Sequence, residues 1–199
     1  MTSFNIIILG DGGVGKSSIT LRFYEDRFED EYHPTVEDAF TMEKVIDREV
    51  VRLEVIDTAG QEGFHHLREM YMSTEGAGYM LAYAINLRDS FLSLTELHKS
   101  LSEARNLGVG QFVPVVLIGN KSDRAEQRCV STAEAMQLAR GFGNDCPFFE
   151  TSAKTGANIE EAFTALVRQM KKSSPIHQKS FSKSKTSKKK AGKSGCSLI

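Results

Sequence analysis

The segment Gly10–Ser17 constrains the fold of this 199-residue chain more than any other feature, because it matches the pattern G-x-x-x-x-G-K-S in full. The match follows the apolar run Phe4–Leu9, which predicts a strand, and leads into a helical pattern over Lys16–Tyr24. Glycines allow a tight loop at such a junction, and the backbone N–H groups of the loop then point inward. Together with the positive end of the helix dipole, they favour phosphate groups. We therefore expect a phosphate-binding loop over Gly10–Ser17, called the phosphate loop below.

Short apolar runs alternate with amphipathic stretches through the first 170 residues, and this alternation predicts an α/β fold. The expected strands are Phe4–Leu9, Ala39–Val45, Val50–Asp57, Gly78–Ile85, Val113–Gly119 and Pro147–Thr151. The expected helices are Lys16–Tyr24, Leu94–Ala104, one that follows a capping box at Ser131–Glu134, and Ile159–Met170. A turn at Ile46–Arg48 joins the second and third strands. The prediction is a six-stranded, mainly parallel sheet with one antiparallel edge strand and helices on both faces. Ligands of such sheets bind at the carboxyl ends of the strands.

The segment 171–199 differs in composition from the rest of the chain. It holds nine of the 25 lysine and arginine residues and none of the 26 acidic residues. The helical periodicity stops near Ser173, and the few apolar side chains beyond it are not enough to offset the entropy of ordering. We predict a domain over residues 1–170 and a disordered, polybasic tail over 171–199. The acidic domain argues against a nucleic-acid partner, whereas the basic tail suits an anionic surface.

The third predicted strand ends in the sequence D-T-A-G-Q, which begins at Asp57. Asp57 would emerge beside the phosphate loop, where a carboxylate suits Mg²⁺ through a water molecule. Gly60 can donate its backbone N–H to a γ-phosphate, and Gln61 has the donor and the acceptor that orienting an attacking water requires. In the phosphate loop, we expect Lys16 to neutralise phosphate charge and Ser17 to offer its hydroxyl group to Mg²⁺.

The ends of the fifth and sixth predicted strands carry residues suited to recognising guanine. The fifth strand leads into Asn120–Asp123, with the sequence N-K-S-D. The carboxylate of Asp123 can accept hydrogen bonds from guanine N1–H and the 2-amino group, whereas adenine would leave it desolvated and unpaired. The sixth strand leads into Thr151–Lys154, with the sequence T-S-A-K, where a backbone N–H can meet guanine O6. These motifs predict a guanine nucleotide as ligand.

Four motifs in this order resemble those of the small GTPases of the Ras superfamily. The resemblance covers residues 4–170 and extends to the C-terminus, and it implies the P-loop NTPase fold of the G domain, with Mg²⁺ and GTP or GDP as ligands. It implies that Thr35 is a second hydroxyl ligand of Mg²⁺ and that Phe28 packs against the guanine. It also implies that Glu29 and Asp30 border the ribose.

The predicted site then falls into three groups of residues. The catalytic residues are Gln61, Lys16 and Gly60. The metal ligands are Ser17, Thr35 and, through water, Asp57. The nucleotide-binding residues are Gly12, Gly13, Val14, Gly15, Lys16, Ser17, Ser18, Phe28, Glu29, Asp30, Tyr32, Thr35, Gly60, Asn120, Lys121, Asp123, Ser152, Ala153 and Lys154. The resemblance also implies two switch segments, around 30–38 and 60–74, that the γ-phosphate orders.

The C-terminus carries a further signal. The chain ends in C-S-L-I, a C-a-a-X box, which makes Cys196 a candidate for prenylation. The final isoleucine leaves the lipid open, although its size favours geranylgeranyl over farnesyl. Three scattered cysteines and the absence of a signal peptide predict an intracellular protein. We expect it at the cytoplasmic face of the plasma membrane, and in the cytosol before prenylation.

Together these features predict a GTP-binding switch of the Ras branch with slow intrinsic hydrolysis. The effector segment Tyr32–Asp38 is similar to that of Ras, but substitutions such as His33 leave the identity of the effectors open. A non-hydrolysing GTP-dependent scaffold is the alternative, and Gln61, Thr35 and Gly12 argue against it. The expected partners are an exchange factor, a GTPase-activating protein, effectors bound through residues 32–40 and the second switch, and an anionic membrane. We expect no nucleic-acid partner and a monomer.

Overall fold

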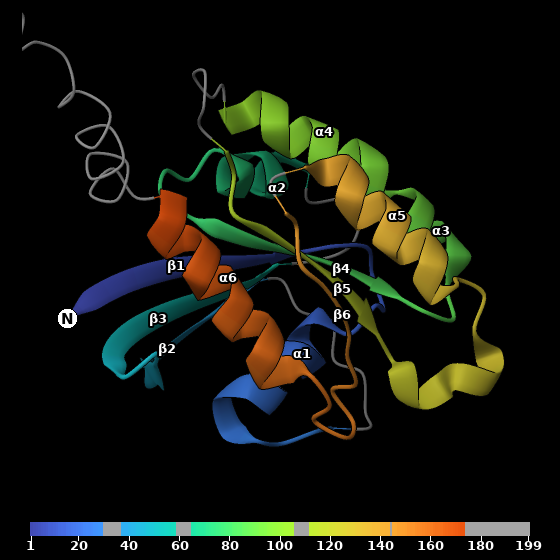
Figure 1. The fold of residues 1–199 in the computed structure, drawn as a ribbon, viewed down its shortest axis with the longest axis horizontal. Coiled ribbons are helices and arrows are strands. Elements are labelled where there is room, and N and C mark those ends of the chain that lie inside the picture. Colours follow the sequence, from blue (N-terminus) through green and yellow to red (C-terminus); the bar gives the residue numbers. More distant parts are fainter. Residues whose placement is uncertain (30–36, 59–64, 106–111, 144, 174–199) are drawn as a thin grey trace, which may run out of the picture.

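The computed structural model describes residues 1–29, 37–58, 65–105, 112–143 and 145–173, which form one sheet flanked by helices (Figure 1). In chain order the elements are β1 (Thr2–Leu9), α1 (Lys16–Glu25), β2 (Glu37–Ile46), β3 (Glu49–Thr58), α2 (His65–Met72), β4 (Gly78–Ala84), α3 (Arg88–Leu92), α4 (Leu94–Arg105), β5 (Val115–Asn120), the 3-10 helix η2 (Ser122–Gln127), α5 (Thr132–Phe142), β6 (Phe148–Glu150) and α6 (Ile159–Ser173). All six predicted strands are present, and none of their ends is more than two residues from its predicted position.

The six strands form a single sheet in the order β2-β3-β1-β4-β5-β6. β2 and β3 pair antiparallel, and every other neighbouring pair is parallel, which confirms the predicted edge hairpin. All residues of β4 and β5 are buried, as expected for parallel strands with helices on both faces. Because β1, β3, β4, β5 and β6 run in the same direction, their carboxyl ends lie along one edge of the sheet.

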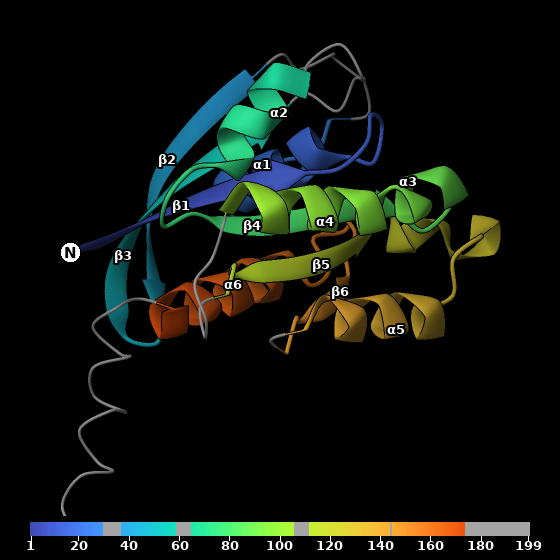
Figure 2. The same cartoon turned by 90° about the horizontal axis from the view of Figure 1, so that it is seen from above.

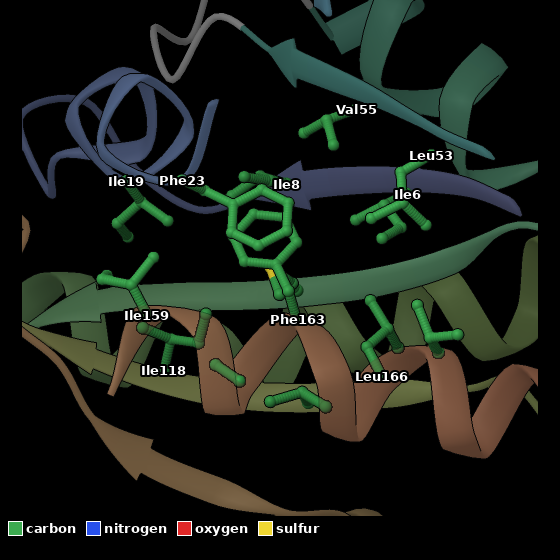
Figure 3. Close-up of a cluster of buried hydrophobic side chains, with 14 of the residues drawn as sticks. Ile6, Ile8, Ile19, Phe23, Leu53, Val55, Ile118, Ile159, Phe163 and Leu166 are labelled. Carbon is green, nitrogen blue, oxygen red and sulfur yellow. The ribbon is translucent and has the colours of Figure 1, made fainter. Parts of the chain in front are cut away.

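Successive side chains of β1 enter two different cores, one on each face of the sheet. Ile6 belongs to the core beneath α1 and α6, whereas Ile7 belongs to the core beneath α2, α3, α4 and α5. In the first core, the rings of Phe23 from α1 and Phe163 from α6 stack with their centroids 3.7 Å apart (Figure 3). This stack ties α1, the helix that follows the phosphate loop, to the last helix of the chain.

Ion pairs join the β2–β3 hairpin to α6, more than 100 residues later in the sequence. Figure 2 shows the turn of this hairpin beside the C-terminal end of α6. The pairs are Lys44–Glu160, Asp47–Arg168 at 2.5 Å and Glu49–Lys171 at 2.6 Å. The helix ends at Ser173, three residues past the predicted domain end at residue 170. Its last turn persists because Lys171 is paired with the hairpin and because basic side chains suit the negative end of a helix dipole.

Three short elements, α2, α3 and η2, are not predicted from the sequence. The helix η2 has no buried residue and α3 has only five residues, so neither shows the repeated apolar spacing that indicates a helix. The capping box of α5 is confirmed, because Ser131 Oγ accepts from the Glu134 N–H at 3.2 Å and a Glu134 oxygen accepts from the Ser131 N–H at 3.0 Å. Within the described ranges, no helix combines the length and the apolar character needed to cross a bilayer.

Candidate nucleotide-binding site

The phosphate loop lies between β1 and α1, at the edge of the sheet where the parallel strands end. Its surroundings require glycine at two positions. A Cβ on Gly10 would lie 2.1 Å from the backbone oxygen of Ala82 in β4, and a Cβ on Gly15 would lie 2.5 Å from Nδ2 of Asn120. Gly15 also has a φ of 93°, in the left-handed region. Gly12, between them, is half-buried. The loop thus packs directly against β4 and the end of β5.

Lys16 begins α1 and has only 6 % of its surface exposed. Its ammonium group donates to the backbone oxygens of Gly10 at 3.0 Å and of Asp11 at 2.9 Å. A buried cation needs such partners, so the loop backbone holds this charge within the phosphate loop. Ser17 and Ser18 follow in the first turn of α1 and are half-buried. The contact of Lys16 with phosphate oxygens stays a prediction.

A buried carboxylate lies beside the phosphate loop. Asp57, near the end of β3, has 1 % of its surface exposed and pairs in register with Ile8 of β1. The neighbouring Thr58 hydroxyl donates to the backbone oxygen of Ile8 at 2.7 Å, which fixes the end of β3 against β1. The Ser17 hydroxyl and the Asp57 carboxylate are hard oxygen donors, and this chemistry fits Mg²⁺. The described part of the chain has no group of three or more His, Cys, Asp or Glu side chains that could hold a metal ion.

Six predicted site residues lie outside the described residues. They are Asp30, Tyr32, Thr35, Gly60, Gln61 and Cys196. Their roles in catalysis, in binding of Mg²⁺ and the ribose, and in lipidation stay predictions. Of the second predicted switch segment, the described part includes α2.

The end of β5 is bonded to the phosphate loop by two side chains. Nδ2 of Asn120 donates to the backbone oxygen of Val14 at 2.9 Å, and Nζ of Lys121 donates to that of Gly13 at 2.6 Å. Asn120 is 1 % exposed and Val14 is fully buried. Burial lowers the pKa of Lys121 from its usual value, and the positive charge of Arg124 lowers it further. The segment Asn120–Asp123, called the first base motif below, is therefore held against the phosphate loop by direct hydrogen bonds.

The segment Thr151–Lys154, called the second base motif below, is in turn hydrogen-bonded to the first base motif. Oδ1 of Asp123 accepts a hydrogen bond from Oγ of Ser152 at 2.6 Å. Ser152 is 1 % exposed, so a buried hydroxyl group orients an exposed carboxylate. Oδ1 of Asn120 accepts from the Thr151 hydroxyl and from the Ala153 N–H, each at 3.3 Å. The motifs that follow β5 and β6 meet, because β5 and β6 are neighbouring parallel strands of the sheet.

Phe28 and Lys154 lie together at the side of this arrangement. Nζ of Lys154 is 5.9 Å from the centroid of the Phe28 ring, and Phe28 packs against the core beneath α1 and α6. Glu29 is exposed and forms an ion pair with Arg27 at 3.1 Å. The contact of Glu29 with a ribose stays a prediction.

Two contacts of the site are missing from the sequence analysis. The guanidinium group of Arg22 in α1 donates to the backbone oxygens of Ala153 and Lys154, about 130 residues away. Ser93, between α3 and α4, donates to Oδ2 of Asp11 at 2.8 Å. A single basic residue in an amphipathic helix normally faces solvent, and Asp11 occupies an unspecified position of the loop pattern. The sequence therefore carries no signal for either contact, because only the fold brings the partners together.

Comparisons with known proteins agree with this geometry. A sequence model described as the Ras family matches residues 5–172. The chain is 41 % identical over 200 residues to the Ras-like protein rasS of Dictyostelium discoideum, and the alignment covers the full length of both chains. The region matched by the family extends from β1 to the last turn of α6, and it contains every described residue of the site.

Proposed function

The chain belongs to the Ras family of small GTPases, which hydrolyse GTP to GDP and phosphate, and we propose that it is a switch whose GTP-bound state binds effectors at a membrane. The bonds from Asn120 to Val14 and from Lys121 to Gly13 carry this proposal, because they join the base motif to the phosphate loop. A ligand that occupies such a site needs a base and phosphate groups on one molecule. A guanine nucleotide has both.

Each residue of the site has a defined task in this proposal. Lys16 and the loop N–H groups offset the charge of the β- and γ-phosphates, and Gln61 orients the attacking water. Mg²⁺, when bound, neutralises charge that develops on the phosphate oxygens. Ser17 and Thr35 would bind that ion through their hydroxyl groups, and Asp57 would bind it through water. The backbone N–H of Gly60 meets the γ-phosphate and so reports which nucleotide is bound.

We expect intrinsic hydrolysis to be slow. The sequence has no arginine between Glu29 and Thr35, so this segment supplies no guanidinium group to the transition state. An activating protein that inserts an arginine would accelerate hydrolysis by several orders of magnitude. Effectors would bind residues 32–40 and the second switch, around 60–74. The edge position of β2 supports this, because an edge strand can pair with a strand of a partner.

Attachment to a membrane is the remaining part of the proposal. A prenyl group on Cys196 gives only marginal binding by itself, so a second signal is needed. The lysines of the tail can supply it, at about 1 kcal/mol for each lysine near an anionic leaflet. The prenylated chain should sediment with phosphatidylserine vesicles and only weakly with neutral ones. Cys196→Ser should abolish this binding, and a variant with Lys188, Lys189 and Lys190 changed to Gln should lose the preference for anionic lipid. Equal binding of that variant and the wild type to anionic vesicles would contradict the role of the tail charge.

A single-turnover assay on the full chain with Mg²⁺ tests the central proposal. The protein should bind GTP and GDP in preference to ATP and release phosphate slowly, and Gln61→Leu should slow the release further while leaving GTP binding unchanged. Tight GTP binding without phosphate release would support the GTP-dependent scaffold instead. A preference for ATP would contradict the assignment of the base motifs.

A further inference from the structure

Arg22 uses every nitrogen of its guanidinium group as a donor. Nε donates to the backbone oxygen of Ala153 at 2.7 Å, and Nη2 donates to that of Lys154 at 2.8 Å. Nη1 donates to the backbone oxygen of Asp26 at 2.9 Å and to its Oδ1 at 3.0 Å. Only 16 % of the Arg22 side chain is exposed. One side chain therefore bonds two segments that are far apart in the sequence.

The first of these segments is the loop that follows β6. The strand ends at Glu150, so its ladder of hydrogen bonds with β5 does not extend to Ala153 and Lys154. On its inner side, the loop is held by Asn120, whose Oδ1 accepts from the Ala153 N–H. On its outer side, it is held by Arg22. The backbone that would face the guanine is thus bonded by both Asn120 and Arg22.

The second segment is the turn that ends α1. Asp26 has a φ of 52° and its N–H donates to the backbone oxygen of Arg22 at 3.1 Å. Because Nη1 of Arg22 also binds Asp26, the direction in which the chain leaves the helix is fixed. Two residues later the chain reaches Phe28, whose ring lies beside the ammonium group of Lys154. Both walls that would enclose the base therefore depend on the same guanidinium group.

We propose that Arg22 is a positioning residue for guanine recognition, and that it acts through the backbone of Ala153 and Lys154 and through the turn before Phe28. The inference deepens the proposed function and rests on it. A planar guanidinium group can reach two adjacent carbonyl groups and a third acceptor at once, whereas the ammonium group of lysine is a single point of charge. Arg22 would hold the backbone that meets O6, and Asp123 would meet the adjacent N1–H and 2-amino groups.

Dissociation of GDP from the full chain in Mg²⁺ provides the first measurement. Arg22→Met keeps the aliphatic stem and removes all the donors, and it should release GDP about tenfold faster or more. Arg22→Lys should release GDP at a rate between those of this variant and the wild type. Arg168→Met is the matched control, because it removes another arginine from an ion pair, with Asp47, on a helix outside the site. It should release GDP at the wild-type rate.

Two nucleotide analogues separate positioning from general loss of stability. The 6-thio analogue of GDP changes only the atom at position 6, and inosine diphosphate lacks only the 2-amino group. Arg22→Met should prefer GDP over the 6-thio analogue less strongly than the wild type does. The variant and the wild type should prefer GDP over inosine diphosphate to the same extent. Equal acceleration for all three nucleotides, or a wild-type rate for GDP, would overturn the inference. Should Arg22→Met fail to fold, the same comparison on Arg22→Lys decides.

The wild-type protein keeps the two proposals apart. A wild type that retains ADP as long as GDP would overturn the proposed function itself. A wild type that selects GDP, together with an unchanged Arg22→Met variant, would overturn only the role of Arg22.

Discussion

In the phosphate loop, the groups predicted to bind phosphate come from eight consecutive residues. Gly10 and Gly15 allow close approach to β4 and Asn120, and backbone oxygens of the loop hold the ammonium group of Lys16. On the base side, the contacts come from side chains on separate segments, in α1, after β5 and after β6. The segment after β5 is held by a side chain of the segment after β6, since Ser152 binds Asp123, and the segment after β6 is held by Arg22 of α1.

The difference has a consequence for how each half responds to change. A site made by the backbone depends on space and on dihedral angles, so removing a side chain nearby should affect it little. A site made by side chains from separate segments depends on individual hydrogen bonds, so the removal of any one of these side chains should weaken nucleotide binding or stability. Four substitutions test this contrast.

The largest effect is expected at Asp123, on the base side. Asp123→Asn replaces an acceptor with a donor that opposes the 2-amino group of guanine, which should weaken GDP binding by about 3 kcal/mol, more than 100-fold. The variant should favour xanthosine diphosphate, whose 2-oxo group accepts a hydrogen bond. Titration of both diphosphates against both proteins measures the change. Asp89→Asn, at an exposed position of α3, is the control, and an unaltered preference in Asp123→Asn would contradict the assignment.

The next effect concerns space in the phosphate loop. Gly15→Ala places a Cβ 2.5 Å from the Asn120 side chain at a φ of 93°, and should weaken GDP binding by about 2 kcal/mol. Gly13→Ala is the matched control, because its φ is also positive, at 74°, but among the described residues no atom beyond the two chain neighbours lies within 4 Å of the added Cβ. It should cost only the backbone strain, about 1 kcal/mol. Equal losses for the two variants in a GDP titration would show that the contact with Asn120 is unimportant.

A smaller effect, on stability, is expected at Glu150, the last residue of β6 before the second base motif. The Glu150 carboxylate accepts from two Arg128 nitrogens, at 2.6 and 2.8 Å, and from the Thr132 hydroxyl at 2.8 Å. The hydrogen bonds from Arg128, and then that from Thr132, hold the pKa of Glu150 below its usual 4.5 despite opposing desolvation. Glu150→Gln should lower the free energy of unfolding by about 1 kcal/mol near neutral pH, after allowance for solvent screening.

The sign of the pH dependence follows from that lowered pKa. The stabilisation by Glu150 is complete above the unfolded-state value of about 4.5 and is lost as the pH falls through the lower folded-state value. Denaturant unfolding of the wild type and Glu150→Gln should therefore converge as the pH is lowered from 5 toward about 3. The exposed Glu161→Gln on α6 serves as the control. A difference that stays constant over this range would contradict the role of the charge.

The smallest effect is expected at Ser93, a side-chain anchor of the phosphate loop. Ser93→Ala removes the bond to Asp11 Oδ2 and should lower the free energy of unfolding by about 0.5–1 kcal/mol. GDP binding should change by less than about twofold, because backbone groups carry that function. Calorimetric titration with GDP and thermal unfolding measure the two quantities. A loss of GDP affinity as large as that of Arg22→Met would remove the contrast between the two halves of the site.

The same contrast explains what sequence reasoning finds and what it misses. The phosphate loop is predictable because its residues are contiguous and their spacing is fixed by the geometry of one turn. The strands are predictable because buried apolar runs such as Gly78–Ala84 are distinct from their surroundings. The pairing of Asp123 with Ser152 follows once the strand order is known. The hydrogen bonds of Arg22 to Ala153 and Lys154 cannot be predicted, because a charged residue in an amphipathic helix gives no sign of a partner about 130 residues away. The helix η2 is missed because it buries no side chain.

The packing of α6 determines when the domain can finish folding. Phe163 and Leu166 fill the middle of the core against β1 and α1, and Lys171 closes the contact with the β2–β3 hairpin (Figure 3). A chain that has been synthesised only as far as Asn158 has all six strands and α1, but it leaves in water the apolar part of the sheet face that α6 covers. Such contacts between distant parts of the sequence make folding slow and leave the incomplete chain open to association with other chains. The domain therefore completes this core only after its final helix has been made.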